Sequence, residues 1–173
     1  IERKFEQIKL SRTKAFSRKH GIAGFITNCA KGFRMTYVTA LGRAISVDHF
    51  GACLRNKKAT KTRREKDWLS AKEKTLNGYK FALALENDRR DGYVTEKVFN
   101  ALAAGAIPIY WGDKRVHDVV PSGSFINVDD FKNAQALAHY LKAVAKNRTL
   151  FDSYHQWNVS SLQTMWSRDC DPN

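Results

Sequence analysis

Short runs of apolar residues alternate along the chain with longer stretches in which apolar residues recur every three or four positions. The short runs are typical of strands that are buried on both faces, and the longer stretches are typical of amphipathic helices. Strands that alternate with helices predict a parallel sheet, because a parallel connection needs a crossover of helix length. We therefore expect an α/β fold in which helices cover both faces of a parallel sheet.

The same pattern places the individual elements. We expect strands at 24–28, 44–48, 81–85, 107–111 and 124–128. We expect helices at 33–41, 67–76, 95–104 and 149–157, and a long amphipathic helix that carries Leu137, Leu141 and Val144. Asp129 or Asp130 is expected to cap this long helix. Gly105 stands in the usual position just past a helix end.

The length of 173 residues favours one domain with a sizeable core. Phe5, Ile8 and Phe16 lie among many basic residues, which predicts a separate amphipathic helix that ends at Gly21. We therefore divide the chain into a linker helix at 1–21, a sheet domain at 22–146, and a C-terminal helix and tail at 147–173. Because the chain opens with Ile1 rather than Met, we expect it to be an excerpt of a longer protein.

The net charge of +13 belongs to the first half of the chain. Residues 1–80 hold 20 Lys and Arg against 6 Asp and Glu, whereas residues 81–173 hold 10 against 11. The densest group, which we call the basic loop, lies at 55–66 and contains Arg55, Lys57, Lys58, Lys61, Arg63, Arg64 and Lys66. Such a loop attracts nucleic acid, an anionic membrane face or an anionic ligand, or is simply a solvated surface. It contains no aromatic residue, and no nucleic-acid-binding motif is present, so we expect no nucleic-acid partner.

Missing patterns exclude several classes of protein. The sequence lacks the glycine motifs of dinucleotide oxidoreductases and P-loop NTPases and the G-x-S-x-G motif of α/β-hydrolases. It also lacks a run of eighteen apolar residues. Cys29, Cys53 and Cys170 are too few and too scattered for a disulfide framework or a zinc site. We expect no metal site, because Asp169-Cys170-Asp171 is far from any strand end and the histidines lack ligand spacing.

Open parallel sheets bind ligands beyond the carboxyl ends of their strands, so polar residues in the following loops are candidates. Lys97 stands in the first turn of the helix after the third strand, and Arg34 has the same place after the first. A cation there opposes the helix dipole at a cost of roughly 0.3–1 kcal/mol, unless an anion binds at the same helix start. The two cations are suited to a pyrophosphate; the alternative is that both pair on the surface with Asp88 or Asp91. Glu96 either accepts hydrogen bonds from ribose hydroxyls or simply favours the helix start.

The segment around the third strand resembles a known family. It reads YKFALALEN at 79–87 and DGYVTEK at 91–97, and the likeness continues through GAIPIYWG at 105–112 and SFINVDDF at 124–131. Upstream, FITNC at 25–29 with Arg34, and HFG at 49–51 with Arg55-Asn56, extend it. Together these motifs, over about residues 22–131, resemble the donor-binding signature of the α-1,3-fucosyltransferases, glycosyltransferase family 10. The Tyr-x-Thr-Glu-Lys element is a specific signal at this spacing.

The resemblance implies a GT-B-type glycosyltransferase, in which two Rossmann-like domains face each other across a cleft. This chain would be the C-terminal, GDP-fucose-binding half. Carried over by position, Arg34 and Lys97 would hold the diphosphate and stabilise the charge on the leaving GDP. Glu96 would bind the ribose, and Asn87 and Tyr93 would line the nucleotide and fucose pocket. The implied reaction is inverting α-1,3 or α-1,4 transfer of L-fucose from GDP-β-L-fucose to an N-acetylglucosamine or glucose hydroxyl of a glycan, without a metal or other cofactor.

The family's general base is a glutamate of the N-terminal domain, and we identify no segment here that supplies it. The resemblance therefore implies an N-terminal acceptor domain of the same protein as a partner, together with the glycan acceptor. One alternative is a transferase of the same architecture that uses another nucleotide-sugar. The other is a basic nucleic-acid-binding module, which steeply salt-dependent DNA binding would reveal.

The few cysteines and the basic first half favour a bacterial cytoplasmic enzyme that contacts the inner membrane face peripherally. The alternative is the Golgi lumen, as part of a type II membrane protein. There the two glycosylation sequons, Asn147-Arg148-Thr149 and Asn158-Val159-Ser160, would matter.

Overall fold

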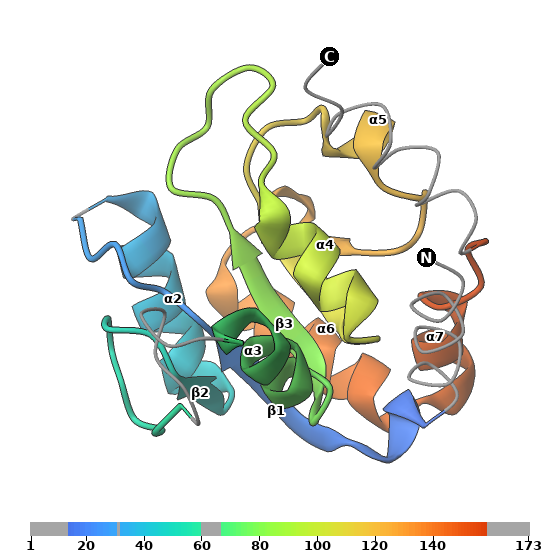
Figure 1. Ribbon diagram of the computed structural model, residues 1–173. Helices are drawn as coiled ribbons and strands as arrows, with labels where there is room; N and C mark the ends of the chain where they lie inside the picture. Colours follow the sequence, from blue (N-terminus) through green and yellow to red (C-terminus); the bar gives the residue numbers. More distant parts are fainter. Residues whose placement is uncertain (1–13, 31, 60–66, 159–173) are drawn as a thin grey trace.

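The computed structural model describes residues 14–30, 32–59 and 67–158 (Figure 1). At its centre lies a parallel sheet of five strands in the order β2-β1-β3-β4-β5. The strands are β1 (Lys19–Gly24), β2 (Val47–His49), β3 (Tyr79–Leu85), β4 (Ile107–Trp111) and β5 (Ile126–Asn127). The parallel sheet that we predicted from the alternation of apolar runs and helices is confirmed.

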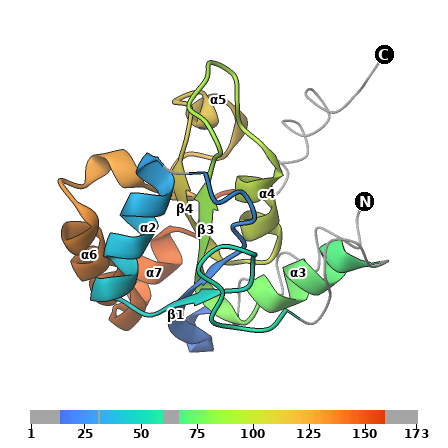
Figure 2. The same cartoon turned by 90° about the vertical axis from the view of Figure 1, so that its left-hand side faces the viewer.

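Helices cover both faces of the sheet, as Figure 2 shows. On one face lie α3 (Trp68–Leu76) and α4 (Glu96–Ala103), which pack against each other and against β3. On the other face lie α2 (Phe33–Ala44), α6 (Ala134–Lys146) and α7 (Arg148–Ser153). The short helix α5 (Val116–Val119) and two 3-10 turns, η1 (Ala15–Ser17) and η2 (Val128–Asp130), complete the described elements. The α/β class with helices on both faces is therefore confirmed.

The central strand β3 is buried along almost its whole length. Phe81 packs beneath Phe151 of α7, and Lys80 beside it is only 1% exposed. The Lys80 ammonium donates to the carbonyl of Ala145 at 2.6 Å and lies 4.0 Å from the centre of the Phe16 ring. It thereby satisfies a carbonyl at the C-terminal end of α6, where the helix dipole favours a positive charge. Burial lowers the pKa of this ammonium below its ordinary value.

The prediction for the start of the sheet is wrong. Residues Lys19 to Gly24 form β1, so Gly21 lies inside a strand and does not end a helix, and the predicted domain boundary at 22 falls within β1. The predicted strand at 24–28 is therefore mostly a loop beyond the sheet. Strand β1 is defined by its pairing with β2 and β3. The sequence did not predict its start, because its first residues are polar and do not form an apolar run. The rest of the predicted N-terminal helix, at 1–13, lies outside the described residues.

The predicted cap of the long helix is also wrong. Helix α6 begins at Ala134, and the side chain of Asn133 caps it by accepting from the amide of Ala136 at 2.9 Å. Asp129 and Asp130 lie instead in the turn η2, which intervenes between β5 and the helix. An asparagine and an aspartate are equally good N-caps, so the sequence could not rank the three positions.

The other boundaries differ by smaller amounts. Strand β2 starts at 47 rather than 44 because α2 continues to 44, β5 is shorter than 124–128, and α7 spans 148–153 rather than 149–157. Strand β4 matches its prediction, and α3 and α4 begin one residue later than predicted. Gly105 adopts a φ of +67° just past α4, a left-handed conformation that glycine tolerates best.

Cys29 and Cys53 form a disulfide, a pairing that the sequence analysis did not predict when it excluded a disulfide framework. The loop after β2 approaches the end of β1 very closely: a Cβ at Gly51 would lie 2.1 Å from the carbonyl oxygen of Ile26. The amide of Cys53 donates to that same oxygen at 2.9 Å. Strand pairing thus brings together two cysteines whose sequence separation is 24. Cys170 lies outside the described residues.

We predict that breaking this disulfide lowers the free energy of unfolding by about 3 kcal/mol, because an open loop of this length gains entropy when the chain unfolds. Urea denaturation with and without dithiothreitol measures the difference. The Cys170→Ser variant is the appropriate background, since it removes the third thiol. Identical urea midpoints in the two conditions would contradict the prediction.

Candidate functional site

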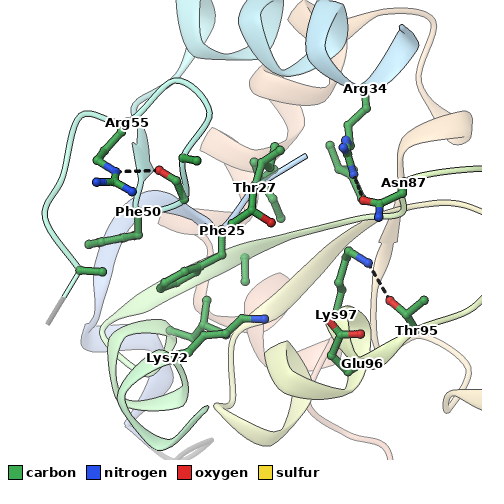
Figure 3. A pocket seen from close by; sticks show the side chains of 18 of the residues that line it. Phe25, Thr27, Arg34, Phe50, Arg55, Lys72, Asn87, Thr95, Glu96 and Lys97 are labelled. Atoms are coloured by element: carbon green, nitrogen blue, oxygen red, sulfur yellow. Dashed lines mark hydrogen bonds between the residues drawn. The ribbon is translucent and has the colours of Figure 1, made fainter. Parts of the chain in front are cut away.

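A cleft of about 1030 Å³ opens at the C-terminal ends of β1 and β3. This volume lies at the upper end of the roughly 300–1,000 Å³ that is usual for small-molecule sites. Its walls come from the end of β1, the loop after β2, α3, the start of α2, and the segment that joins β3 to α4 (Figure 3). All five predicted site residues line it, namely Arg34, Asn87, Tyr93, Glu96 and Lys97.

Arg34 is the second residue of α2 and is only 7% exposed. Its guanidinium donates from Nη1 to Oδ1 of Asn87 and from Nη2 to the carbonyl of Asn28 at 2.6 Å. Burial lowers the pKa of this guanidinium, and the charge of the nearby Glu86 opposes that shift. Within the described part of the chain, Arg34 forms no ion pair. A buried cation with only neutral hydrogen-bond acceptors is electrostatically suited to a bound anion.

Lys97 is the second residue of α4, and its side chain is 20% exposed. Its ammonium donates to Oε2 of Glu86 at 2.6 Å and to the hydroxyl of Thr95 at 2.7 Å. Lysine has three ammonium donors, so these two bonds leave one for a ligand in the cleft. The cation at the helix start is therefore held by a buried carboxylate, which the helix-dipole argument from sequence did not include.

Glu86 is the site residue that the sequence analysis did not single out, although it follows β3 directly. Its carboxylate is fully buried. It accepts from the amide of Thr95 at 2.8 Å, from the Thr95 hydroxyl at 2.9 and 2.8 Å, and from Lys97. One side chain thus fixes the first turn of α4 and the direction of the Lys97 ammonium. One sequence signal could have identified Glu86. A carboxylate that directly follows an apolar strand, with a lysine in the first turn of the next helix, can pair with that lysine.

The alternative that Arg34 and Lys97 pair with Asp88 or Asp91 is wrong. Asp88 pairs with Arg90 at 3.0 Å, and Asp91 pairs with Arg115 at 3.0 Å. These acidic residues belong to the long loop between β3 and α4, which rises at the top of Figure 1 next to α5.

Contacts with the segment after β4 anchor this loop. The Nε of Arg89 donates to the carbonyl of Gly112 at 3.0 Å, and the amide of Gly92 donates to the carboxylate of Asp113. The anchored loop presents Tyr93 to the cleft, with the Arg90 guanidinium 5.0 Å from the centre of the Tyr93 ring.

Further cations line the cleft besides the predicted pair. Arg55 and Lys58 of the basic loop are exposed on its wall, and Lys72 of α3 is 9% exposed. The part of the basic loop at 60–66 lies outside the described residues. Because these cations share the cleft with Arg34, their position favours the anionic ligand among the partners we considered for the basic loop.

The described residues hold neither a cluster of metal-ligating side chains nor a membrane-spanning helix. In the ranges 14–30, 32–59 and 67–158, no three His, Cys, Asp or Glu side chains gather as a metal site would require. The Asp169-Cys170-Asp171 triplet, at which we expected no metal, lies outside these ranges. No helix in the described part of the chain has the length and apolar character needed to cross a membrane.

We predict that Glu86→Gln lowers the free energy of unfolding by about 2–4 kcal/mol, because it leaves the Lys97 ammonium without its counter-charge. The double variant Glu86→Gln/Lys97→Met should lose less free energy of unfolding than the two single variants lose when their losses are added. Urea denaturation of the four proteins measures this coupling. The matched control is Asp152→Asn, which breaks the exposed Arg148–Asp152 pair at 2.5 Å and should cost less than about 0.5 kcal/mol. If the losses of the two single variants simply added in the double variant, the Glu86–Lys97 ion pair would not stabilise the fold as we predict.

Comparison with known proteins identifies the family of this fold and cleft. The model of glycosyltransferase family 10 (fucosyltransferase), C-terminal part, matches residues 15–170. The chain is 40% identical over 133 residues to alpha-(1,3)-fucosyltransferase B of Drosophila melanogaster, covering 73% of this chain and 30% of the relative. It is 37% identical over 129 residues to GDP-fucose protein O-fucosyltransferase 3 of Xenopus laevis, covering 73% of this chain and 28% of the relative.

A solved structure of an alpha1,3-fucosyltransferase with GDP shares the fold, with a TM-score of 0.72 and 23% identity. The match covers 96% of this chain and 51% of that chain. The chain thus spans about a third of the curated relatives and about half of this structure. On the match to the family model, the chain belongs to glycosyltransferase family 10, the fucosyltransferases, and corresponds to its C-terminal part.

Proposed function

We propose that this chain is the donor-binding half of an inverting fucosyltransferase that takes L-fucose from GDP-β-L-fucose. The observation that carries the proposal is the convergence of Arg34 and Lys97, from the starts of α2 and α4, on one cleft. Membership of the fucosyltransferase family supports the choice of donor. A ligand with two linked phosphates would give the buried Arg34 its missing counter-charge.

The geometry suits departure of a GDP leaving group. As the bond between fucose and the β-phosphate breaks, negative charge develops on the diphosphate. Arg34 and Lys97 are held in place before the reaction, by Asn87 and Asn28 in one case and by Glu86 and Thr95 in the other. Such fixed cations stabilise developing charge without reorganisation at the moment of reaction. We propose that they do so without a metal or other cofactor.

The remaining predicted residues take the other parts of the donor. Glu96 is exposed in the first turn of α4 and lines the cleft beside Lys97, which suits it to accept hydrogen bonds from the ribose hydroxyls. Asn87 and Tyr93 line the same cleft and would border the nucleotide and the fucose. Asn87 also accepts from Arg34, so its side chain would orient that guanidinium as well as border the ligand.

Because the chain spans about a third of its curated relatives, we propose that an N-terminal domain of the same protein supplies the general base and binds the acceptor. The primary proposal is α-1,3 or α-1,4 transfer to an N-acetylglucosamine or glucose hydroxyl of a glycan. The similarity to a protein O-fucosyltransferase favours a second candidate, transfer to a protein hydroxyl. Incubation of the longer protein with labelled GDP-fucose and either a lactosamine or an unglycosylated protein acceptor would separate the two.

The Cys29–Cys53 disulfide favours the Golgi lumen over the bacterial cytoplasm as the location, because disulfides persist in oxidising compartments. Asn147 of the first sequon is exposed at the junction of α6 and α7, where a lumenal glycan would have room. We therefore propose a lumenal location. Peripheral membrane contact through the basic first half belongs to the alternative cytoplasmic location, because the anionic lipids that would attract it face the cytoplasm.

We predict that Arg34→Ala or Lys97→Ala weakens GDP binding about ten- to a hundredfold, since a charge-assisted hydrogen bond contributes roughly 1.5–3 kcal/mol. Arg43→Ala is the matched control: it removes an exposed arginine at the other end of α2 and should change the Kd less than about threefold. Isothermal titration calorimetry measures all three. If Arg43→Ala weakened GDP binding while Arg34→Ala and Lys97→Ala left it unchanged, the phosphate site would lie elsewhere.

We also predict that these 173 residues bind GDP-fucose yet transfer little fucose to a type 1 or type 2 lactosamine. A positioned base contributes typically 10²–10⁴-fold, and alignment of the two substrates adds to it. Transfer should return when an N-terminal domain of about 150 residues precedes Ile1. Fucose transfer by the two proteins at equal concentration is the measurement. Full turnover by the short chain would mean that a carboxylate within it, with Asp113 or Asp91 the first to test, acts as the base.

A further inference from the structure

The cleft extends well beyond Arg34 and Lys97. Its other end is formed by Phe25 at the end of β1, Phe50 in the loop after β2, and Lys72 of α3 (Figure 3). The two phenylalanine rings are stacked, with centroids 5.1 Å apart and planes 18° apart. The Lys72 ammonium lies 5.7 Å from the centre of the Phe25 ring. We call these three residues the aromatic end of the cleft; the roles proposed above do not use them.

The two ends of the cleft suit the two ends of a nucleoside diphosphate, because Arg34 and Lys97 lie at one end and the aromatic residues lie at the other. In the view of Figure 3, Glu96 lies next to Lys97, and the Lys72 ammonium points toward these two residues from the opposite side of the cleft. Helix α3 packs against α4, so the two helices border the cleft together. With the diphosphate at Arg34 and Lys97 and the ribose at Glu96, the nucleobase extends toward the aromatic end.

We propose that Lys72 contacts the nucleobase of the donor and selects guanine over adenine; this inference rests on the proposed function. Guanine presents two acceptors, O6 and N7, on one edge, whereas adenine presents an amino donor in place of O6. An ammonium group only donates, so it binds the guanine edge and repels the adenine amino group. Its charge makes the contact stronger than one between neutral groups.

The surroundings of Lys72 hold its ammonium where this selection requires it. The side chain is 9% exposed, and Figure 3 shows it extending from α3 into the cleft. Its position over the Phe25 ring is a cation–π contact, and the stacked Phe50 supports that ring from the loop after β2. Leu76 and Ala82 line the same region and give the base an apolar wall, in which a hydrogen bond is stronger than in water. Lys72 is thus a specificity-determining residue, distinct from the two cations assigned to the phosphates.

The test compares GDP, inosine diphosphate and ADP by isothermal titration calorimetry on the chain and its Lys72→Met variant. Inosine diphosphate keeps O6 and N7 but lacks the amino group of guanine. Methionine keeps most of the apolar stem of lysine and removes the ammonium with its charge and its N–H donors. We expect the variant to bind GDP and inosine diphosphate about tenfold more weakly and ADP less than threefold more weakly. Lys72→Arg, which offers two donors to O6 and N7, should restore the preference for GDP over ADP. Lys74→Met, an exposed lysine of the same helix, should bind all three as the unchanged chain does.

Two outcomes would overturn the inference. An equal loss for all three nucleotides would place Lys72 at the phosphates, and unchanged affinities would remove it from the site. If Lys72→Met melts at a lower temperature than the unchanged chain, Lys72→Arg decides the question, because it keeps a cation at the same position. A chain that binds none of the three nucleotides would refute the proposed function itself, which separates that failure from a failure of the Lys72 assignment.

Discussion

The buried carboxylate of Glu86 joins the sheet to the site. It stands at the end of β3 and accepts from the amide and hydroxyl of Thr95 and from the ammonium of Lys97. A buried carboxylate is tolerated only when donors surround it, and here those donors are the first turn of α4 and the site lysine. The start of α4, the direction of Lys97 and the end of the central strand are therefore set by one group of contacts. The cleft depends on this group because α4 forms one of its walls.

Arg34 is held in a different way on the opposite wall. Its partners are the amide oxygen of Asn87 and the carbonyl of Asn28, both neutral. Lys97 thus has its counter-charge within the fold, whereas the described residues give Arg34 none. A dianionic ligand would be attracted most strongly to Arg34, while Lys97 contributes a single oriented donor. Among the described residues, the pair thus combines one cation that lacks a counter-ion with one that is fixed in direction. Under the proposed function, the first would bind the diphosphate and the second would stabilise the leaving group.

Contacts at the edge of the sheet shape the other end of the cleft. Gly51 lets the loop after β2 approach the backbone at Ile26, and the Cys29–Cys53 disulfide closes the same region. This close approach places Phe50 against Phe25, and α3 brings Lys72 over the Phe25 ring. The disulfide lies near the cleft, so the same constraint that stabilises the edge of the sheet supports the wall of the proposed nucleobase site.

The sequence by itself determined the alternation of strands and helices, the placement of β4, and the positions of Arg34 and Lys97 at helix starts. These features depend on apolar periodicity and on residues close in the chain, and the family motif covers the same segment. Only the tertiary structure decided that Lys97 pairs with Glu86, that Cys29 meets Cys53, that polar Lys19 begins a strand, and that Lys72 enters the cleft. The physical reason is that each of these depends on which strand ends become neighbours. A parallel sheet in the order β2-β1-β3-β4-β5 brings together segments that are far apart along the chain, and no local pattern records that order.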